Sequence, residues 1–283
     1  MSRKNVTRYL TALLCCAGAL GALMARPFAA TDAAGSPQDL VNAAYAAMGG
    51  DKLKSITLRA SLQQFDPGES YSVADPNKPD TGVSDLVQSR DLQRGLTRDE
   101  WVRPKADDGG KRTYTEIVTP TAGYVIGNDA TNGRLPKRTV KGNQPEHTMS
   151  GRRLTATIRE VERPFIVLEM KRHPDRVAAT GDQTIAGKTY PAARYRDDYG
   201  SFIVMFDPTT HLPARVRTLD WDALEGDSTF DAEYSDWRDV SGAKIAFLAH
   251  YTLNGMKVAD LKLSSVMVNP ALAAKTFEIP KRC

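Results

Sequence analysis

Strict alternation between apolar and polar residues restricts the fold of this chain more than any other feature of its sequence. In residues 55–64 every second side chain is apolar, from Ile56 to Leu62, and residues 230–235 repeat this pattern. Successive side chains of a β-strand point to opposite faces, so each segment predicts a strand with one buried face. The chain is therefore expected to build a large part of its core from the face of a sheet.

Turn signals separate these segments. Asn254–Gly255 is a strong hairpin signal, because both residues adopt the positive φ angles of a two-residue turn. Ala186–Gly187, Asp207–Pro208 and Ser241–Gly242 predict further turns. Residues 202–206 are continuously apolar, which predicts a strand covered on both faces. This spacing predicts roughly 10 or 11 strands in an antiparallel sheet or barrel.

A helix is predicted over residues 37–48. Ser36 is a favourable N-cap, Pro37 stands at the first helical position, and Asp39 completes a pattern similar to a capping box. Gly49 and the glycine after it end the helix. Its apolar stripe needs a partner, for which the sheet is the simplest candidate.

A second helical segment is predicted between residues 154 and 168. Its apolar side chains recur at helical spacing, and they are Leu154, Ile158, Val161, Phe165 and Leu168. Pro164 removes a backbone donor and is expected to split or kink the segment. Helices beside a large antiparallel sheet predict an α+β fold, in which a curved sheet has helices packed on it.

The first 30 residues have the three parts of a cleavable secretory signal peptide. Basic residues at Arg3, Lys4 and Arg8 precede an apolar run from residue 9 to 25, and small residues follow at 27–30. A retained membrane anchor is the alternative, but the run is short for a span of about 20 residues. The sequence predicts a mature chain that begins near residue 31 and acts in the periplasm or outside the cell.

The charge balance argues against a nucleic-acid partner. The chain has 38 Lys plus Arg and 34 Asp plus Glu, and four basic residues lie within the first 30 positions. The remaining 38 − 4 = 34 basic residues equal the 34 acidic ones. A nucleic-acid-binding chain needs a basic footprint, which the predicted mature chain lacks. The basic run at 134–141 predicts a solvated loop, with contact to anionic lipid head groups as the alternative.

No pattern typical of a catalytic or metal site is present in the sequence. Its histidines lie in unrelated contexts; His211 is expected in a surface turn and His250 in a structural role on a strand. Asp197–Asp198 precede a turn and are expected to stabilise it. The sequence contains no zinc-ligand spacing, no G-x-S-x-G elbow, no Walker loop and no G-x-G-x-x-G. We therefore predict no catalytic residues, no metal, no cofactor and no enzymatic activity, although a site assembled from distant residues stays an open alternative.

Several segments, taken together and in order, carry a resemblance to a known family. They are residues 115–127, 149–154, 202–208 with 212–213, 235–239 and 268–270. They resemble the N-terminal accessory domain of exported metallo-β-lactamase-fold hydrolases. That domain is in turn similar to the periplasmic carrier and sorting proteins of outer-membrane lipoproteins. The resemblance implies a single domain over residues 31–283, folded as an unclosed β-barrel that is plugged by helices and encloses an apolar cavity.

Two functions follow from this resemblance. The first is a non-catalytic periplasmic domain that binds a lipid, an acyl chain or a lipoprotein tail. The alternative is an accessory module of a metallo-β-lactamase-fold hydrolase whose catalytic domain is encoded separately or lost. The hydrolase's H-x-H-x-D-H motif does not occur in this chain, so no metal ligand is carried over.

The predicted strands and helices supply the candidate residues of the ligand cavity. If their side chains fill the space between sheet and helices, the domain is a packed module that binds no ligand; if the sheet curves away from the helices, the gap is apolar. The candidate residues are Ile56, Leu58, Leu62, Leu154, Ile158, Phe202, Val204, Phe206, Phe230 and Tyr234.

Overall fold

The computed structural model describes residues 35–65, 82–104, 110–129, 146–222 and 226–280, all within the compact unit of residues 35–283. The predicted signal peptide and the basic run at 134–141 lie outside the described residues. The helices are α1 (Pro37–Ala47), α2 (Gly151–Glu162) and α3 (Ile166–Arg172), with the short 3-10 helices η1 (Gly50–Lys52), η2 (Arg163–Phe165), η3 (Pro174–Arg176) and η4 (Ala274–Phe277).

The strands follow the helix α1 in three groups along the chain. The first group is β1 (Ser55–Gln64), β2 (Ser84–Asp91), β3 (Leu96–Pro104), β4 (Lys111–Val118), β5 (Gly123–Gly127) and β6 (Glu146–Thr148). The second, after α3, is β7 (Val177–Ala179), β8 (Gln183–Ile185), β9 (Lys188–Tyr190), β10 (Ala192–Arg196) and β11 (Ser201–Phe206). The third is β12 (Pro213–Asp222), β13 (Gly226–Val240), β14 (Ala243–Leu253) and β15 (Met256–Val268).

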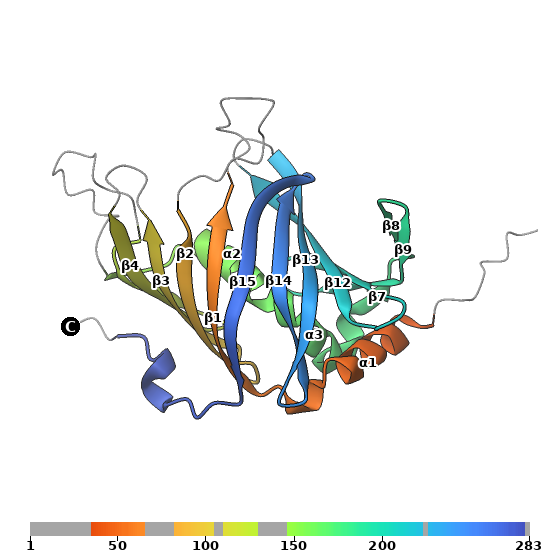
Figure 1. Cartoon of the computed structure of the whole chain (residues 1–283), viewed down its shortest axis with the longest axis horizontal. Helices are drawn as coiled ribbons and strands as arrows, with labels where there is room; N and C mark the ends of the chain where they lie inside the picture. Colours follow the sequence, from red (N-terminus) through yellow and green to blue (C-terminus); the bar gives the residue numbers. More distant parts are fainter. Residues whose placement is uncertain (1–34, 66–81, 105–109, 130–145, 223–225, 281–283) are drawn as a thin grey trace, which may run out of the picture. The chain divides into compact units, whose positions relative to one another are not determined.

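One large antiparallel sheet dominates the described residues. It has 13 strands in the order β6-β5-β4-β3-β2-β1-β15-β14-β13-β12-β11-β10-β7, and β8 and β9 form a separate hairpin. The edge strands β6 and β7 do not pair with each other, so the sheet is not closed. Figure 1 shows it strongly twisted, with α2 behind the central strands. The predicted α+β fold with a curved antiparallel sheet is confirmed.

The prediction of about 10 or 11 strands was too low. The strands with the weakest signal in the sequence are β6, β7, β8 and β9, each of 3 residues. Three residues are too few to establish an alternation. They are strands because a neighbouring backbone pairs with them, as β10 does with β7.

Local sequence signals cap α1 as predicted, whereas α2 begins at Gly151 and α3 ends at Arg172, both outside the predicted range 154–168. Ser36 accepts a hydrogen bond from the backbone of Asp39, whose carboxylate accepts one from the Ser36 backbone at 3.0 Å, which completes a capping box. The second helical segment is split where Pro164 lies, into α2, η2 and α3. The split changes the direction of the chain, so that α3 contacts α1 while α2 contacts the sheet.

The predicted turns are also present. Asn254 has φ +49° and Gly255 φ +81°, which is the left-handed backbone of a tight turn between β14 and β15. Ser241 and Gly242 have the same signs between β13 and β14. Because tight turns join neighbouring strands, these hairpins set the register of the long central strands.

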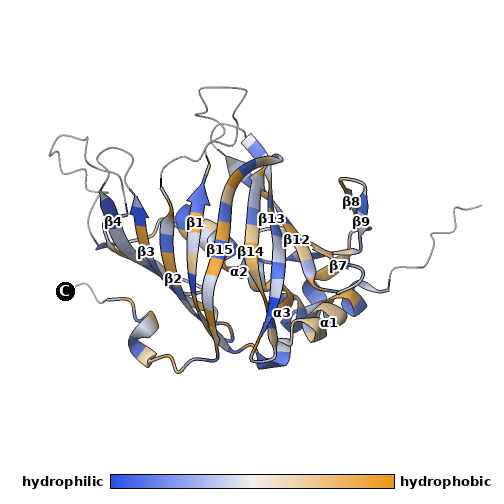
Figure 2. Cartoon of the chain, viewed as in Figure 1, coloured by the Kyte–Doolittle hydropathy of each residue, from blue (hydrophilic) through white to orange (hydrophobic). Residues whose placement is uncertain are grey.

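The core lies on one face of the sheet, under the helices. Burial alternates along β1, where Ile56, Leu58 and Leu62 are buried and Arg59 is exposed. Figure 2 shows the corresponding blue and orange bands along the strands. On β11, Met205 is buried on the face opposite Val204, but Ile203 is partly exposed, so the prediction of cover on both faces holds for part of that strand. None of the helices in the described part of the chain combines the length and apolar character needed to cross a bilayer.

Candidate functional site

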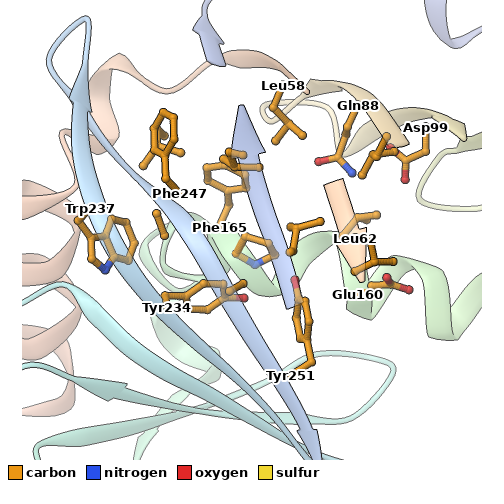
Figure 3. Close-up of a pocket in the computed structure, with 18 of the residues that line it drawn as sticks. Leu58, Leu62, Gln88, Asp99, Glu160, Phe165, Tyr234, Trp237, Phe247 and Tyr251 are labelled. Carbon is orange, nitrogen blue, oxygen red and sulfur yellow. The ribbon is translucent and has the colours of Figure 1, made fainter. Parts of the chain in front are cut away.

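A mostly apolar cavity lies between the sheet and the helical segment α2–η2. Its volume is about 90 Å³, and Figure 3 shows its labelled side chains converging on the space. The strands contribute Leu58, Leu62, Leu86, Gln88, Asp99, Trp101, Tyr234, Trp237, Lys244, Ile245, Ala246, Phe247, Ala249, Tyr251, Leu261 and Leu263, and the helical segments contribute Met48, Glu160, Val161, Pro164 and Phe165.

The alternation of the strands explains why this lining is apolar. Leu58 and Leu62 come from the buried face of β1, and Phe247 and Ala249 from the buried face of β14. Pro164 interrupts the α-helix, and its neighbour Phe165 packs into the core between α2 and α3. Pro164, which interrupts the helix, therefore also helps to form the helical wall of the cavity.

One end of the cavity is polar. Gln88 of β2 and Asp99 of β3 face each other in the register of the sheet, and the Gln88 side chain hydrogen-bonds to Asp99. The Oδ1 atom of Asp99 is buried without a hydrogen-bond partner among the described residues. Burial raises the pKa of Asp99 to about 7, with a further contribution from the negative charge of Glu116. Glu160 of α2 lies at the same end of the cavity (Figure 3).

Glu160 borders three spaces at once. It lines the apolar cavity, a polar cavity of about 300 Å³ and a wider cleft of about 900 Å³. Glu160 is an exposed residue whose side chain faces these spaces, and the loss of hydration among the surrounding groups raises the pKa of its carboxyl group. The positive charge of Arg163 acts in the opposite direction.

The polar cavity adjoins the apolar one through Asp99, Trp101, Glu160 and Val161, which line both. Its other lining residues are Arg103, Tyr114, Glu116, Asp129, Arg153 and Thr157. Carboxyl groups outnumber guanidinium groups in this lining. The polar cavity therefore disfavours anionic groups and favours neutral or cationic ones.

The wider cleft is rich in arginine. Arg152, Arg159 and Arg163 recur along one side of α2, at the spacing that places side chains on one helix face. Asp220 of β12 binds two of them: Oδ1 pairs with Arg159, and Oδ2 lies 3.7 Å from Arg163. Arg152 lies over the ring of the exposed Trp221 at 4.2 Å from its centroid. The cleft shares Leu62, Glu160 and Tyr251 with the apolar cavity.

A further cleft, of about 560 Å³, lies on the other side of Phe165. Burial raises the pKa of Glu162 there to about 7, and the carboxylates of Asp197 and Glu169 add to this effect. Asp197 also stabilises the β10–β11 turn as predicted, because its Oδ1 accepts hydrogen bonds from the backbone of Tyr199 and Gly200 at 2.8 Å.

The structure places the sequence-predicted cavity residues in different surroundings. Leu58, Leu62 and Tyr234 line the apolar cavity. Phe230 lines the arginine-rich cleft together with Leu62, and Ile158 lines the cleft near Glu162. The remaining candidates pack in the core or against it, and they are Ile56, Leu154, Phe202, Val204 and Phe206. Binding of a ligand by any of these residues stays a prediction.

Sequence reasoning missed the polar end of the cavity. Thr97, Asp99 and Trp101 alternate on the buried face of β3, so the period of two alone places Asp99 inside. That signal was available but was hidden by charged neighbours on both sides. Glu160 gave no signal, because its position depends on how α2 lies across the sheet.

The histidines lie apart from these cavities or at their rims. His211 has φ +60° in the turn between β11 and β12, and His250 on β14 is an exposed residue that pairs with Asp260 on β15. His147 lies on β6, with Nε2 3.7 Å from Asp129. Among the described residues, no group of three or more His, Cys, Asp or Glu side chains is arranged to hold a metal ion.

Comparison with known proteins identifies the fold. No family model matches the chain, and no curated protein matches it. A LolA superfamily protein from Nitrosomonas europaea has a similar structure, with a TM-score of 0.53, 11% sequence identity and coverage of 87% of this chain and 99% of that chain. A DUF1329 family protein from Desulfovibrio piger gives a TM-score of 0.52 at 12% identity, with coverage of 86% and 98%. At such low identity the likeness shows the fold alone, and the chain shares its fold with these two proteins.

Proposed function

We propose that this chain is a non-catalytic domain that binds an acyl chain, or a lipid or lipoprotein tail that carries one. The observation that carries the proposal is the apolar cavity between α2–η2 and the sheet. Each methylene group that leaves water for such a site contributes about 0.8 kcal/mol, so an acyl chain gains affinity with length. The proposal includes export to the periplasm after cleavage near Thr31, which N-terminal sequencing of periplasmic protein tests.

The size of the cavity sets how an acyl chain is held. A volume of about 90 Å³ admits a short segment of chain. A longer chain continues past Leu62 and Tyr251, which also line the arginine-rich cleft, or past Asp99 and Glu160 into the polar cavity, or displaces α2–η2 from the sheet. We expect the chain end to lie against Phe165 and Phe247, and the rest to follow one of these routes.

The proposal is tested first by organic extraction and mass spectrometry of gently purified protein, and then by titration with N-phenylnaphthylamine, an uncharged fluorescent probe of apolar sites. Ala249→Phe narrows the cavity, and we expect it to weaken probe binding at least about tenfold. Ala179→Phe, on the exposed end of the edge strand β7, is the matched control and leaves binding unchanged. Phe247→Ala enlarges the cavity and is expected to bind longer chains despite a loss of about 3 kcal/mol in stability.

Protein that contains no lipid and does not bind the probe contradicts the proposal. The comparisons above do not bear on the alternative, an accessory module of a metallo-β-lactamase-fold hydrolase, and it stays a prediction.

A further inference from the structure

The apolar cavity ends in a buried hydrogen-bond acceptor that has no partner among the described residues. Asp99 is 4% exposed and lines both the apolar and the polar cavity, yet its Oδ1 atom has no hydrogen-bond partner among the described residues. A buried acceptor without a partner costs about 1–3 kcal/mol, and more when it is charged. A ligand that brings a donor to this atom would remove that cost.

Glu160 reaches the same end of the cavity from the opposite layer. Asp99 belongs to the sheet and Glu160 to α2, so the two carboxyl groups border the junction of the apolar and polar cavities from two sides (Figure 3). Gln88 lies beside Asp99 and hydrogen-bonds to it. A head group that leaves the apolar cavity at this end passes between these side chains.

The charges around this junction disfavour an anion. In the polar cavity, Arg153 pairs with Glu116 at 2.5 Å and also with Asp129. Arg103 lies over the ring of Trp101, 4.1 Å from its centroid. Within the lining of the polar cavity, Arg103 is thus the positive charge near the carboxyl groups of Asp99 and Glu160, and Arg90 and Arg163 act on these two groups from outside that lining. Of the residues that line the apolar cavity, Lys244 is a cation, but its ammonium lies 3.9 Å from Asp239.

From this geometry we infer that the cavity is selective for amphiphiles whose head group donates hydrogen bonds and carries no negative charge, such as a hydroxyl or a primary amide. A segment of the acyl chain occupies the apolar cavity, and the head group donates to Asp99 and Glu160 at its polar end. A carboxylate head is repelled there, and an ester head has no donor to offer. The inference rests on the proposed function, because it requires that an acyl chain enters the cavity.

The test compares four ligands with the same ten-carbon chain: decanol, decanamide, methyl decanoate and sodium decanoate. Each displaces N-phenylnaphthylamine at about pH 8, where Asp99, whose pKa is about 7, is ionised and acts as an acceptor. We expect decanol and decanamide to bind at least about tenfold more tightly than methyl decanoate and decanoate.

Substitutions test which side chains cause the difference in affinity between the neutral and the anionic ligands. Asp99→Asn combined with Glu160→Gln removes both negative charges while keeping the shapes, and we expect it to bring decanoate within about threefold of decanol. Glu100→Gln is the matched control, because Glu100 lies on the exposed face of β3 and pairs with Arg98 there. We expect Glu100→Gln to bind the four ligands with the same relative affinities as the wild type.

The outcomes separate the inference from the proposed function. If wild-type protein binds methyl decanoate or decanoate as tightly as decanol, or if the double variant still rejects decanoate, the inference is wrong although acyl chains bind. If none of the four ligands binds, the proposed function itself fails.

Discussion

At the scale of single residues, buried carboxyl groups couple this fold to pH. Asp99 has a pKa of about 7 in the folded chain, compared with 3.8 for an ordinary aspartate, because burial disfavours its charged form. Ionisation of Asp99 therefore costs more in the folded state than in the unfolded state. The folded chain binds more protons between these values, so the contribution of Asp99 to stability falls as pH rises from about 4 to about 7.

Asp99→Asn should abolish this contribution. We expect the variant to match wild type near pH 4 and to exceed its free energy of unfolding by a few kcal/mol near pH 8. Urea unfolding across this pH range measures the difference, and Glu100→Gln on the opposite face should show no such trend. An equal difference at both pH values would contradict the assignment.

A second residue-scale prediction concerns the aspartate that binds two buried arginines. Asp220 pairs with Arg159 and Arg163, and Thr218 donates a hydrogen bond to it at 2.6 Å. Asp220→Asn leaves both guanidinium groups without their anion, and we expect a loss of about 2–4 kcal/mol. Asp236→Asn, which removes the partner of the exposed Arg238, is the control and should leave the unfolding midpoint nearly unchanged. If the two substitutions lower the stability equally, Asp220 does not stabilise the buried Arg159 and Arg163 in the expected way.

At the scale of elements, the β14–β15 hairpin is held by more than its own turn. The Oδ1 atom of Asn254 accepts a hydrogen bond from the backbone of Thr229 at 2.9 Å, and its Nδ2 donates to Ser228 at 3.1 Å. The turn is thus attached to β13. Asn254 also has a positive φ, which few residues with a side chain adopt easily.

Asn254→Ala should therefore cost about 1–3 kcal/mol, the sum of a strained backbone and lost hydrogen bonds. Thermal unfolding measures the loss. Met256→Ala, a substitution of the exposed first residue of β15, should have a much smaller effect. A similar loss in the two variants would contradict a special role for Asn254.

The elements that could be predicted are those with a local cause. The capping box at Ser36 predicted α1, Pro164 predicted the break after α2, and Asn254–Gly255 predicted a hairpin. Pairing between β1 and β15 has no local signal, because these strands lie at opposite ends of the described chain and meet only in the folded sheet.

The candidate site was less predictable for the same reason. Alternation placed Leu58 and Leu62 on an inner face, where they line the apolar cavity. Glu160 reaches its junction because α2 packs across the sheet, and this packing depends on residues far away along the chain. A cavity depends on what the side chains leave unfilled, and periodicity does not report that.

At the scale of the whole unit, one core cluster joins the helices to the sheet. It includes Val41 of α1, Val167 of α3, Ile56 of β1 and Phe247 of β14. A shared core predicts that residues 35–283 unfold as one cooperative unit. In scanning calorimetry of this fragment we expect a single transition whose calorimetric and van't Hoff enthalpies agree. Two separable transitions would contradict the single-domain interpretation.

The open sheet has a consequence for how copies of this chain meet at high concentration. A sheet edge is a template onto which an extended strand from another molecule can add, and such growth leads to aggregation. Within the part of the chain that the structure describes, each template is 3 residues long, since β6 and β7 are the edges there. A strand from another molecule finds few backbone groups to pair with at these edges. The sheet can therefore stay open without a long edge that promotes aggregation.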